Sequence, residues 1–350
     1  MSKFRVALSS DFKKPDGTPA YPVVDLAPLA DDPDIELVFI DAVDGQMSAA
    51  ALAGFDALIL LVPRFDRTSI PANDSLAVVA RFGVGFDSVD VAACSDTGIA
   101  VANTPDGVRR PVAASILTLV LALAGKLFVK DQLTRTGPAG FAAMPDHMGL
   151  GLIGRTLGSV GVGNIGAEMF RLFKPLDMRF IAHDPYVSAE QAAELGVTLV
   201  DRDTVFRDSD FLAMNTPLTP ETRKLVNRER LARMKPTAYL INTSRGPVVD
   251  QPALVEALTS GIIAGAGIDV FDPEPPAADE PLLALDNVIV TPHALCWTDQ
   301  CFAGIGASAV NAVMDVKRGT APTHLVDRAV ADSTRFQARL DAYRTAFGGS

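Results

Sequence analysis

The chain has 350 residues, which is enough for two domains that each bury a core. Hydrophobic residues make up 48% and charged residues 21%, so the composition excludes a disordered chain or a fibrous repeat. Lys and Arg number 31 against 42 Asp and Glu, and the net charge of -11 repels a phosphate backbone, so nucleic acid is not expected as a partner.

Short runs rich in Val, Ile, Leu and Phe alternate with helical patterns from the N-terminus onward. This alternation is typical of repeated β-α units in parallel sheets, so the predicted fold class is α/β. The first hundred residues predict one small sheet, with strands at residues 4–9, 36–40, 57–62, 76–82 and 99–101.

An apolar stretch at residues 111–123 predicts a crossover helix, with Pro111 in the first turn, where its missing N–H costs nothing. Arg109 and Arg110 precede this helix and are candidates for binding an anionic substrate tail. The apolar run is too short and too rich in small residues to span a membrane, so no membrane partner is expected.

A second and larger sheet is predicted from strands at residues 156–161, 179–183, 197–200, 211–215, 238–241, 266–270 and 288–290. The chain then returns as a long helix at 299–317 and ends in a polar tail. This path predicts a discontinuous first domain (1–104 and 295–330), a second domain (105–294) and a C-terminal tail (331–350). We expect a hinged cleft between the two domains.

Three cysteines, Cys94, Cys296 and Cys301, are too few for a disulfide framework, and their odd number is typical of a reducing compartment. The N-terminal residues contain no apolar segment of signal-peptide length. The expected location is therefore the cytoplasm. The histidines show no metal-ligand spacing with cysteines or acids, so no metal site is expected.

The first strand of the second sheet runs into a glycine turn of the form G-x-G-x-x-G, followed by a helix predicted at 167–176. Gly161 permits the tight turn, Gly163 lets the backbone approach a pyrophosphate, and Gly166 allows close helix packing. The N-terminus of the helix then receives the anion.

The next strand ends in Asp184, 23 residues after Gly161. This spacing places a carboxylate where an adenosine ribose presents its hydroxyl groups. A 2′-phosphate at that position would meet a negative charge, and Pro185 and Tyr186 supply no cation. The sequence therefore predicts NAD, and not NADP, as the cofactor.

Four further polar residues follow strands of the second sheet. Arg245 ends an apolar strand and offers a fork for a carboxylate. Asp269, Glu274 and His293 follow the next two strands. Because the carboxyl ends of parallel strands share one edge, these side chains are expected on one rim.

These motifs resemble those of the D-isomer-specific 2-hydroxyacid dehydrogenases, which include phosphoglycerate, glyoxylate/hydroxypyruvate and D-lactate dehydrogenases. The resemblance extends from about residue 80 to residue 326. It rests on GVGNIG with Asp184, NTPLTPETRKLVN from Asn215, INTSRGPVVD around Arg245, GIDVFDPEP, and TPH ending at His293. It implies a Rossmann cofactor domain at 105–294 and a flavodoxin-like substrate domain.

The resemblance also implies roles for individual residues. Arg245 would bind the substrate carboxylate and polarise the keto oxygen, His293 would transfer the hydroxyl proton, and Glu274 would hydrogen-bond His293. The backbone of Gly83, Val84 and Gly85 would bind the substrate carboxylate. The cofactor-binding residues would be Gly161, Gly163, Asn164, Ile165, Gly166, Asp184, Asn215, Thr216, Pro217, Thr243 and Asp269, the last at the nicotinamide carboxamide.

The physical chemistry agrees with these roles. A nearby carboxylate favours the imidazolium form of His293, so the ring can donate a proton during keto-acid reduction. We therefore predict an NAD-dependent oxidoreductase that interconverts a small 2-keto acid and its D-2-hydroxy acid. The family also implies a homodimer formed near the crossover helix, whose apolar face needs a partner surface.

Several positions depart from the family pattern or allow two interpretations. Ala114 stands where many relatives have glutamate, and Ala294 follows His293 where they often have glycine. Trp297 either forms an aromatic wall over the substrate or packs at the hinge. Arg64 lies where phosphoglycerate enzymes keep a phosphate-binding arginine, or it is a solvated surface residue.

Two alternative functions remain open. Formate or phosphite oxidation uses related enzymes, but formate enzymes usually carry glutamine where this chain has Glu274. The other alternative is a binding protein that senses NAD(H), as the C-terminal-binding transcriptional corepressors do. These corepressors also retain the Arg, Glu and His set, so the sequence does not separate them from the enzymes.

Overall fold

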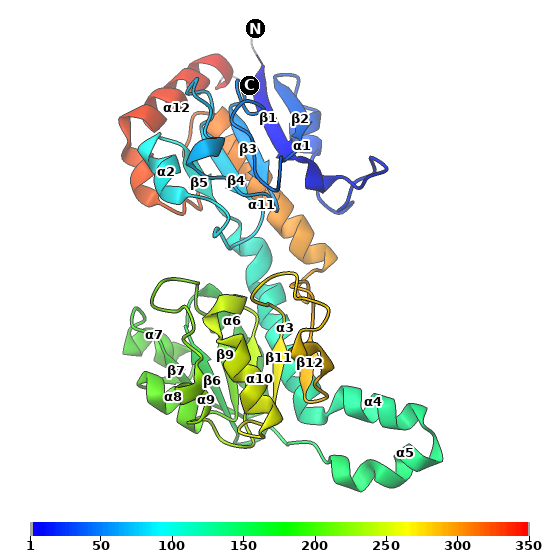
Figure 1. Ribbon diagram of the computed structural model, residues 1–350. Helices are drawn as coiled ribbons and strands as arrows, with labels where there is room; N and C mark the ends of the chain where they lie inside the picture. The colour runs from blue at the N-terminus through cyan, green and yellow to red at the C-terminus, as the bar shows by residue number, and fades with distance from the viewer. Residues whose placement is uncertain (1–2, 349–350) are drawn as a thin grey trace. The chain divides into compact units, whose positions relative to one another are not determined.

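The computed structural model describes residues 3–348 and contains two compact units. Unit 1 comprises Met1–Val108 and Trp297–Ser350, and unit 2 comprises Arg109–Cys296. Each unit contains its own parallel sheet (Figure 1).

Unit 1 is built on a five-stranded parallel sheet with the strand order β2-β1-β3-β4-β5. Every residue of β3 and β5 is buried, as expected for a parallel sheet covered on both faces. Helix α11 packs against β3 and β4, and α12 packs against α11. The elements of this unit are β1 (Phe4–Ser9), α1 (Ala27–Ala30), β2 (Ile35–Ile40), β3 (Ala57–Leu60), β4 (Val78–Arg81), α2 (Val91–Asp96), β5 (Ala100–Ala102), α11 (Asp299–Lys317) and α12 (Thr334–Phe347).

Unit 2 is built on a seven-stranded parallel sheet with the order β12-β11-β10-β9-β6-β7-β8. The direction of winding reverses between β6 and β9, which is where doubly wound sheets hold their ligands. The strands are β6 (Thr156–Val160), β7 (Arg179–His183), β8 (Val197–Leu199), β9 (Phe211–Met214), β10 (Tyr239–Asn242), β11 (Gly265–Ile268) and β12 (Val288–Val290).

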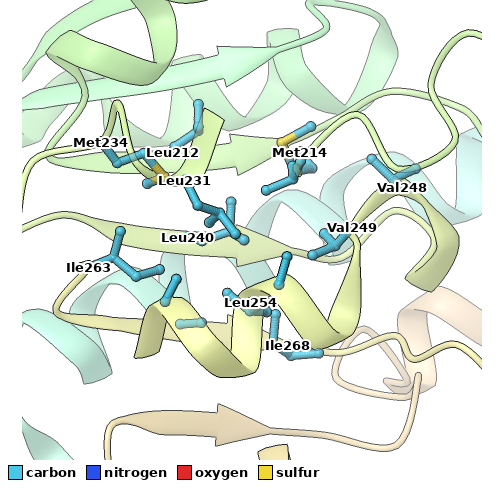
Figure 2. Close-up of a cluster of buried hydrophobic side chains, with 14 of the residues drawn as sticks. Leu212, Met214, Leu231, Met234, Leu240, Val248, Val249, Leu254, Ile263 and Ile268 are labelled. Carbon is cyan, nitrogen blue, oxygen red and sulfur yellow. The ribbon is translucent and has the colours of Figure 1, made fainter. Parts of the chain in front are cut away.

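The sheet of unit 2 has a separate apolar cluster on each face. Figure 2 shows one of them, in which Leu212 of β9 and Leu240 of β10 meet Leu254. The helices of this part of the chain are α3 (Pro105–Gly125), α4 (Leu127–Arg135), α5 (Pro138–Ala143), α6 (Asn164–Phe173), α7 (Ala189–Glu194), α8 (Arg202–Asp208), α9 (Arg228–Leu231) and α10 (Gln251–Thr259).

The predicted strands are confirmed in both units. The bounds of β1, β7, β12 and α11 agree with the prediction, and the other strands agree to within two residues at each end. Helix α6 begins three residues earlier than predicted, at Asn164, directly after the glycine turn. Strand positions were predictable because buried parallel strands are short apolar runs bounded by polar or glycine residues.

The prediction for the crossover helix was wrong in its length. Helix α3 begins at Pro105, so Pro111 lies inside the helix and Arg109 and Arg110 are helical. The side chain of Arg110 pairs with Glu168 at 2.6 Å. Helix α3 has 21 residues and is long and apolar enough to cross a membrane by length and composition alone. However, 56% of its most apolar 18-residue segment is buried inside the protein.

The prediction of a separate polar tail was also wrong. Residues 334–347 form α12, which belongs to unit 1. Phe336 is fully buried, and Tyr343 packs edge-on against Phe4 of β1 with ring centroids 5.1 Å apart. The hydroxyl of Tyr343 also donates to Asp56 at 2.9 Å. The C-terminal helix therefore completes the core of unit 1.

Residues 127–148 form a helical arm that the sequence did not predict. Figure 1 shows α4 and α5 side by side, extending from the rest of unit 2. No residue of α4 is buried. Large apolar side chains of the arm are more than half exposed, namely Leu127, Phe128, Phe141, Met144 and Met148.

Candidate active site

The glycine turn after β6 has the backbone geometry that its residues require. Gly161 has φ +98°, and a Cβ atom at this position would collide with the carbonyl oxygen of Asn215. A Cβ atom on Gly163 would meet open space, so a ligand can approach this backbone. A Cβ atom on Gly166 would lie 2.6 Å from the carbonyl oxygen of Gly161. The first glycine and the third are therefore needed by the fold, whereas the second leaves room for an anion.

Asn215 and Ser159 hold this turn in place. The side-chain amide of Asn215 donates to the hydroxyl oxygen of Ser159 at 2.9 Å, and that hydroxyl donates to the carbonyl oxygen of Gly161 at 2.6 Å. Asn215 follows β9 and Gly161 follows β6, so this network lies where the winding of the sheet reverses. The sequence did not reveal Ser159, although a hydroxyl inside a buried strand is a signal for such a role.

Asp184 lies directly after β7, and backbone N–H groups fix its carboxylate. Oδ2 accepts from Val162 at 2.7 Å, and Oδ1 accepts from Tyr186 at 2.8 Å. The Val162 bond connects the acid to the glycine turn. Because each carboxylate oxygen has a second lone pair, both can still accept from a ligand hydroxyl.

The other predicted cofactor residues lie at the same edge of the sheet. Asn164 and Ile165 form the first turn of α6, whose N-cap Gly163 provides no side-chain cap. Thr216 and Pro217 follow β9, and Thr243 follows β10. This edge offers uncapped N–H groups that donate, an open glycine and a carboxylate that accepts, and these groups fit a dinucleotide.

Arg245 is held by Asn242, the last residue of β10. The amide nitrogen of Asn242 donates to the carbonyl oxygen of Arg245 at 3.0 Å. The guanidinium of Arg245, which is half-buried, donates to the carbonyl oxygen of Ser244 at 2.7 Å. A Cβ atom on Gly246 would collide with the carbonyl oxygen of Phe271, so the Arg245 loop packs closely on the segment that leads to Glu274.

Glu274 and His293 form the pair that the sequence predicted to lie on one rim. Nδ1 of His293 lies 2.8 Å from Oε2 of Glu274, and Oε1 of Glu274 accepts from the N–H of Phe271 at 2.9 Å. Partial burial by itself raises the pKa of Glu274. The hydrogen bonds from His293 and Phe271 and the charges of His293 and Arg245 outweigh this, so the pKa lies below its usual range. Glu274 is therefore a carboxylate at neutral pH.

The backbone of His293 is left-handed, with φ +54°. Such a conformation is uncommon for a residue other than glycine and occurs at functional sites when the surroundings impose it. Here the surroundings include Asp269, which is 3% exposed. Its Oδ1 accepts from the N–H groups of Ala294 and Leu295, at 3.1 and 3.3 Å, and from the hydroxyl of Thr291 at 2.5 Å.

In unit 1 the predicted carboxylate-binding loop follows β4. Gly83 has φ +132°, and its N–H donates to the hydroxyl oxygen of Thr104 at 2.8 Å. The carbonyl oxygen of Val84 accepts from the side chain of Asn103 at 3.0 Å. Gly85 lies in the same loop and is half-buried. These bonds fix the loop at the carboxyl end of the sheet.

Arg64 and Trp297 also lie in unit 1. Arg64 is exposed, and its charge contributes to lowering the pKa of Asp66 after the hydrogen bonds from Thr68. Trp297 is 51% exposed and packs edge-on against Tyr21 and Phe302, with ring centroids 5.8 and 5.1 Å away. Trp297 is thus part of an aromatic cluster, and its contact with substrate stays a prediction.

Among the described residues no group of three or more His, Cys, Asp or Glu side chains is arranged to hold a metal ion. Asn242 and Thr291 were missed from the sequence. A polar residue at the end of a buried strand, as Asn242 is in the run Tyr-Leu-Ile-Asn, is the signal that could have found the first of them.

Residues 117–294 match the family model described as D-isomer specific 2-hydroxyacid dehydrogenase, NAD binding domain. The glyoxylate reductase of Korarchaeum cryptofilum is 40% identical over 277 residues, covering 79% of this chain and 83% of that protein. The D-3-phosphoglycerate dehydrogenase of Archaeoglobus fulgidus is 36% identical over 256 residues, 73% of this chain and 48% of that relative, so this chain spans about half its length. The structure of D-lactate dehydrogenase from Escherichia coli superposes with a TM-score of 0.75 at 28% identity, covering 92% of this chain and 100% of that one.

The chain therefore belongs to the D-isomer-specific 2-hydroxyacid dehydrogenase family. It is an oxidoreductase with a nicotinamide cofactor, as the family resemblance predicted. The two parallel-sheet α/β domains that the sequence predicted are confirmed.

Proposed function

We propose that the protein reduces a small 2-keto acid to its D-2-hydroxy acid, or catalyses the reverse reaction. In this reaction Arg245 anchors the substrate carboxylate, His293 transfers the proton and Glu274 supports His293. The observation that carries the proposal is the 2.8 Å contact between Nδ1 of His293 and Oε2 of Glu274, with the Arg245 charge close enough to affect the pKa of Glu274. The cysteine count supports a cytoplasmic location.

In this proposal each nitrogen of His293 has a separate task. Nδ1 donates to the Glu274 carboxylate, which leaves Nε2 to face the substrate. In the reductive direction Nε2–H gives its proton to the keto oxygen as that oxygen gains negative charge. The neutral ring that remains is the base for the reverse reaction. Arg245 meanwhile holds the carboxylate through parallel N–H groups and draws electron density toward the keto oxygen.

A bound nicotinamide supplies or accepts the hydride. The residues that would hold the dinucleotide are those of the glycine turn with α6, Asp184, and the residues that follow β9 and β10. The backbone of the Gly83–Gly85 loop in unit 1 would bind the substrate carboxylate, because N–H groups of a glycine loop can approach an anion closely.

Replacing Glu274 with Gln is expected to change the pH dependence of reduction. Glu274 is ionised at neutral pH because its pKa is lowered, so its charge stabilises the protonated form of His293 that reduction requires. The glutamine side chain has no carboxylate to protonate as the pH falls, so the acidic limb that protonation of Glu274 produces should be absent from the kcat/KM profile of the variant. At neutral pH we expect kcat/KM to fall roughly 10-fold.

Steady-state rates of NADH oxidation across the pH range test this prediction. Glu256→Gln on α10 serves as the matched control, because Glu256 pairs with the exposed Arg228 outside the site. A Glu274→Gln profile that superposes on that of the wild type would show that this carboxylate does not act through His293.

The cofactor is proposed to be NAD and not NADP. The Asp184 carboxylate stands at the end of β7 where a 2′-phosphate would be repelled. Asp184→Asn keeps an acceptor for Val162 but removes the charge. We expect kcat/KM for NADPH relative to NADH to rise by about 10-fold in this variant. Parallel kinetics with both cofactors measure the ratio, and an unchanged ratio would refute the role of Asp184.

The protein is further proposed to form a homodimer through the helical arm of residues 127–148. Five large apolar side chains of this arm are more than half exposed, and exposed apolar side chains that are concentrated in one segment mark protein interfaces. The double variant Phe128→Glu/Phe141→Glu is expected to sediment as a monomer at micromolar concentration, whereas the wild type sediments as a dimer. Leu283→Glu, at an exposed apolar residue outside the arm, controls for added charge. A monomeric wild type would refute the proposal.

A further inference from the structure

Three adjacent strands of unit 2, β10, β11 and β12, end at the loops that carry the proposed catalytic side chains. β10 leads to Arg245, β11 leads to Glu274, and β12 leads to His293. Two buried residues join these loops, Asn242 at the end of β10 and Asp269 directly after β11. They are 1% and 3% exposed, so their polar atoms depend on partners within the protein.

Asn242 binds the Arg245 loop through both polar atoms of its side chain. Its Oδ1 accepts from the N–H and the hydroxyl of Ser244, at 3.1 and 2.8 Å, and its Nδ2 donates to the carbonyl oxygen of Arg245 at 3.0 Å. Its own carbonyl oxygen accepts from the N–H of Asp269 at 3.0 Å. Asn242 therefore fixes the backbone on both sides of the Ser244–Arg245 peptide and connects it to Asp269.

Asp269 continues the connection to the His293 loop through one side-chain oxygen. The hydroxyl of Thr291 donates to Oδ1 at 2.5 Å, and the two N–H groups that follow His293 donate to the same atom. The N–H of Thr291 also donates to the carbonyl oxygen of Ile268 at 2.9 Å, which aligns β12 with β11. His293 is thus flanked on both sides by groups bound to one carboxylate oxygen.

This arrangement accounts for the left-handed backbone of His293. A non-glycine residue in this conformation is strained and persists only where neighbouring bonds impose it. The Thr291 hydroxyl lies before His293 and the Ala294 and Leu295 N–H groups lie after it, so the turn between them cannot relax without breaking a bond to Asp269. A cofactor contact of Asp269 alone would not require the Thr291 hydroxyl.

We propose that Thr291 and Asn242 are positioning residues of the reaction. Thr291 acts through Asp269 to hold His293 against Glu274, and Asn242 holds the peptide that orients Arg245. This inference rests on the proposed function of Arg245 and His293. The two residues should therefore affect different kinetic parameters. Thr291 supports proton transfer by His293 and should act mainly on kcat, whereas Asn242 supports substrate binding by Arg245 and should act mainly on KM.

Thr291→Val removes the hydroxyl donor and keeps the shape of the side chain, and Thr291→Ser restores the donor. Because a displacement of about 1 Å at a catalytic group can cost 10²-fold, we expect Thr291→Val to lower kcat by roughly 10- to 100-fold. The KM for the keto acid and the Kd for NADH, measured by energy transfer from the single tryptophan, should stay within about 3-fold of the wild type. Thr291→Ser should recover most of kcat.

Thr259→Val is the matched control, because the Thr259 hydroxyl also donates within unit 2, to the carbonyl oxygen of Val255 at 2.9 Å on α10. It should leave kcat unchanged.

Asn242→Asp keeps the acceptor for Ser244 and removes the donor to Arg245. This variant should raise the KM for the keto acid by about 10-fold, more than it lowers kcat. Thermal unfolding of each variant shows whether it is folded.

The inference is overturned if Thr291→Val keeps wild-type kcat while His293→Ala loses it. It is also overturned if Thr291→Ser fails to restore kcat in a folded protein, or if kcat and KM change in parallel in both variants. If His293→Ala retains full activity, the proposed function itself fails, and this outcome is distinct from the first three. Should Asn242→Asp not fold, the Thr291 series still decides the proposal for His293.

Discussion

His293→Ala is expected to lower kcat for keto-acid reduction by roughly 10²- to 10⁴-fold, which is the usual contribution of a general acid. Nδ1 of the ring lies 2.8 Å from Oε2 of Glu274, and in the proposed reaction Nε2 faces the substrate. Because the alanine side chain removes no part of the glycine turn, the Kd for NADH should change little. Steady-state kinetics with a keto acid and NADH measure the loss.

The control for this variant is His324→Ala. His324 also lies against a carboxylate, with Nε2 2.7 Å from Oδ2 of Asp106, but it belongs to unit 1 and has no proposed role in the reaction. The change in kcat of His324→Ala measures the effect of removing a histidine–carboxylate pair that has no proposed role in the reaction. Equal kcat values for the two variants would show that His293 is not the proton donor.

Replacing Arg245 should affect substrate binding as well as turnover. Arg245→Met removes the carboxylate anchor and the positive charge beside the keto oxygen, so we expect kcat/KM to fall by roughly 10²- to 10³-fold, with KM raised and kcat lowered. Arg245→Lys keeps the charge but loses the planar fork, so kcat/KM should fall less than in Arg245→Met, mainly through a higher KM.

Arg233→Lys tests whether any arginine change in this unit has such an effect. Arg233 is partly exposed and pairs with Asp203 at 2.9 Å and Glu229 at 2.7 Å, away from the loops that carry the site. It should retain wild-type kinetics. A folded Arg245→Met protein with unchanged KM and kcat would exclude Arg245 as the anchor of the substrate.

The sequence predicted the sheets and the glycine turn because their causes are local. The strand before Gly161 is a short apolar run, and the positive φ at Gly161 needs a residue without a side chain. The spacing to Asp184 placed the acid at the end of the neighbouring strand. The position of His293 and Glu274 on one rim followed because both residues come after strands of one parallel sheet, whereas their pairing was implied by the family resemblance.

Other features depended on contacts between residues far apart in the chain. Helix α3 continues through Pro111, and its N-terminal part approaches α11 so closely that a Cβ atom on Gly304 would lie 2.8 Å from Cα of Gly107. Local propensity places a helix start at Pro111, so it cannot reveal a helix that tertiary packing extends. The burial of Phe336 in α12 likewise depends on strands at the other end of the sequence.

The candidate site shows the same division between local and distant causes. Residue types and strand ends indicated Arg245, Glu274 and His293. The bonds that hold them were not predictable, because the Asp269 carboxylate and the Thr291 hydroxyl meet only when β11 and β12 pair. The left-handed backbone of His293 follows from those bonds and has no signal in the residue itself.

The most direct measurement is oxidation of NADH by the wild-type protein with a panel of 2-keto acids that differ in side-chain size and in distal phosphate, followed by chiral analysis of the product. We expect at least one keto acid to be reduced, with the D-2-hydroxy acid as the product. Tight binding of NADH without reduction of any keto acid would contradict the account and favour a sensor of NAD(H). An L-hydroxy acid product would contradict the proposed stereochemistry.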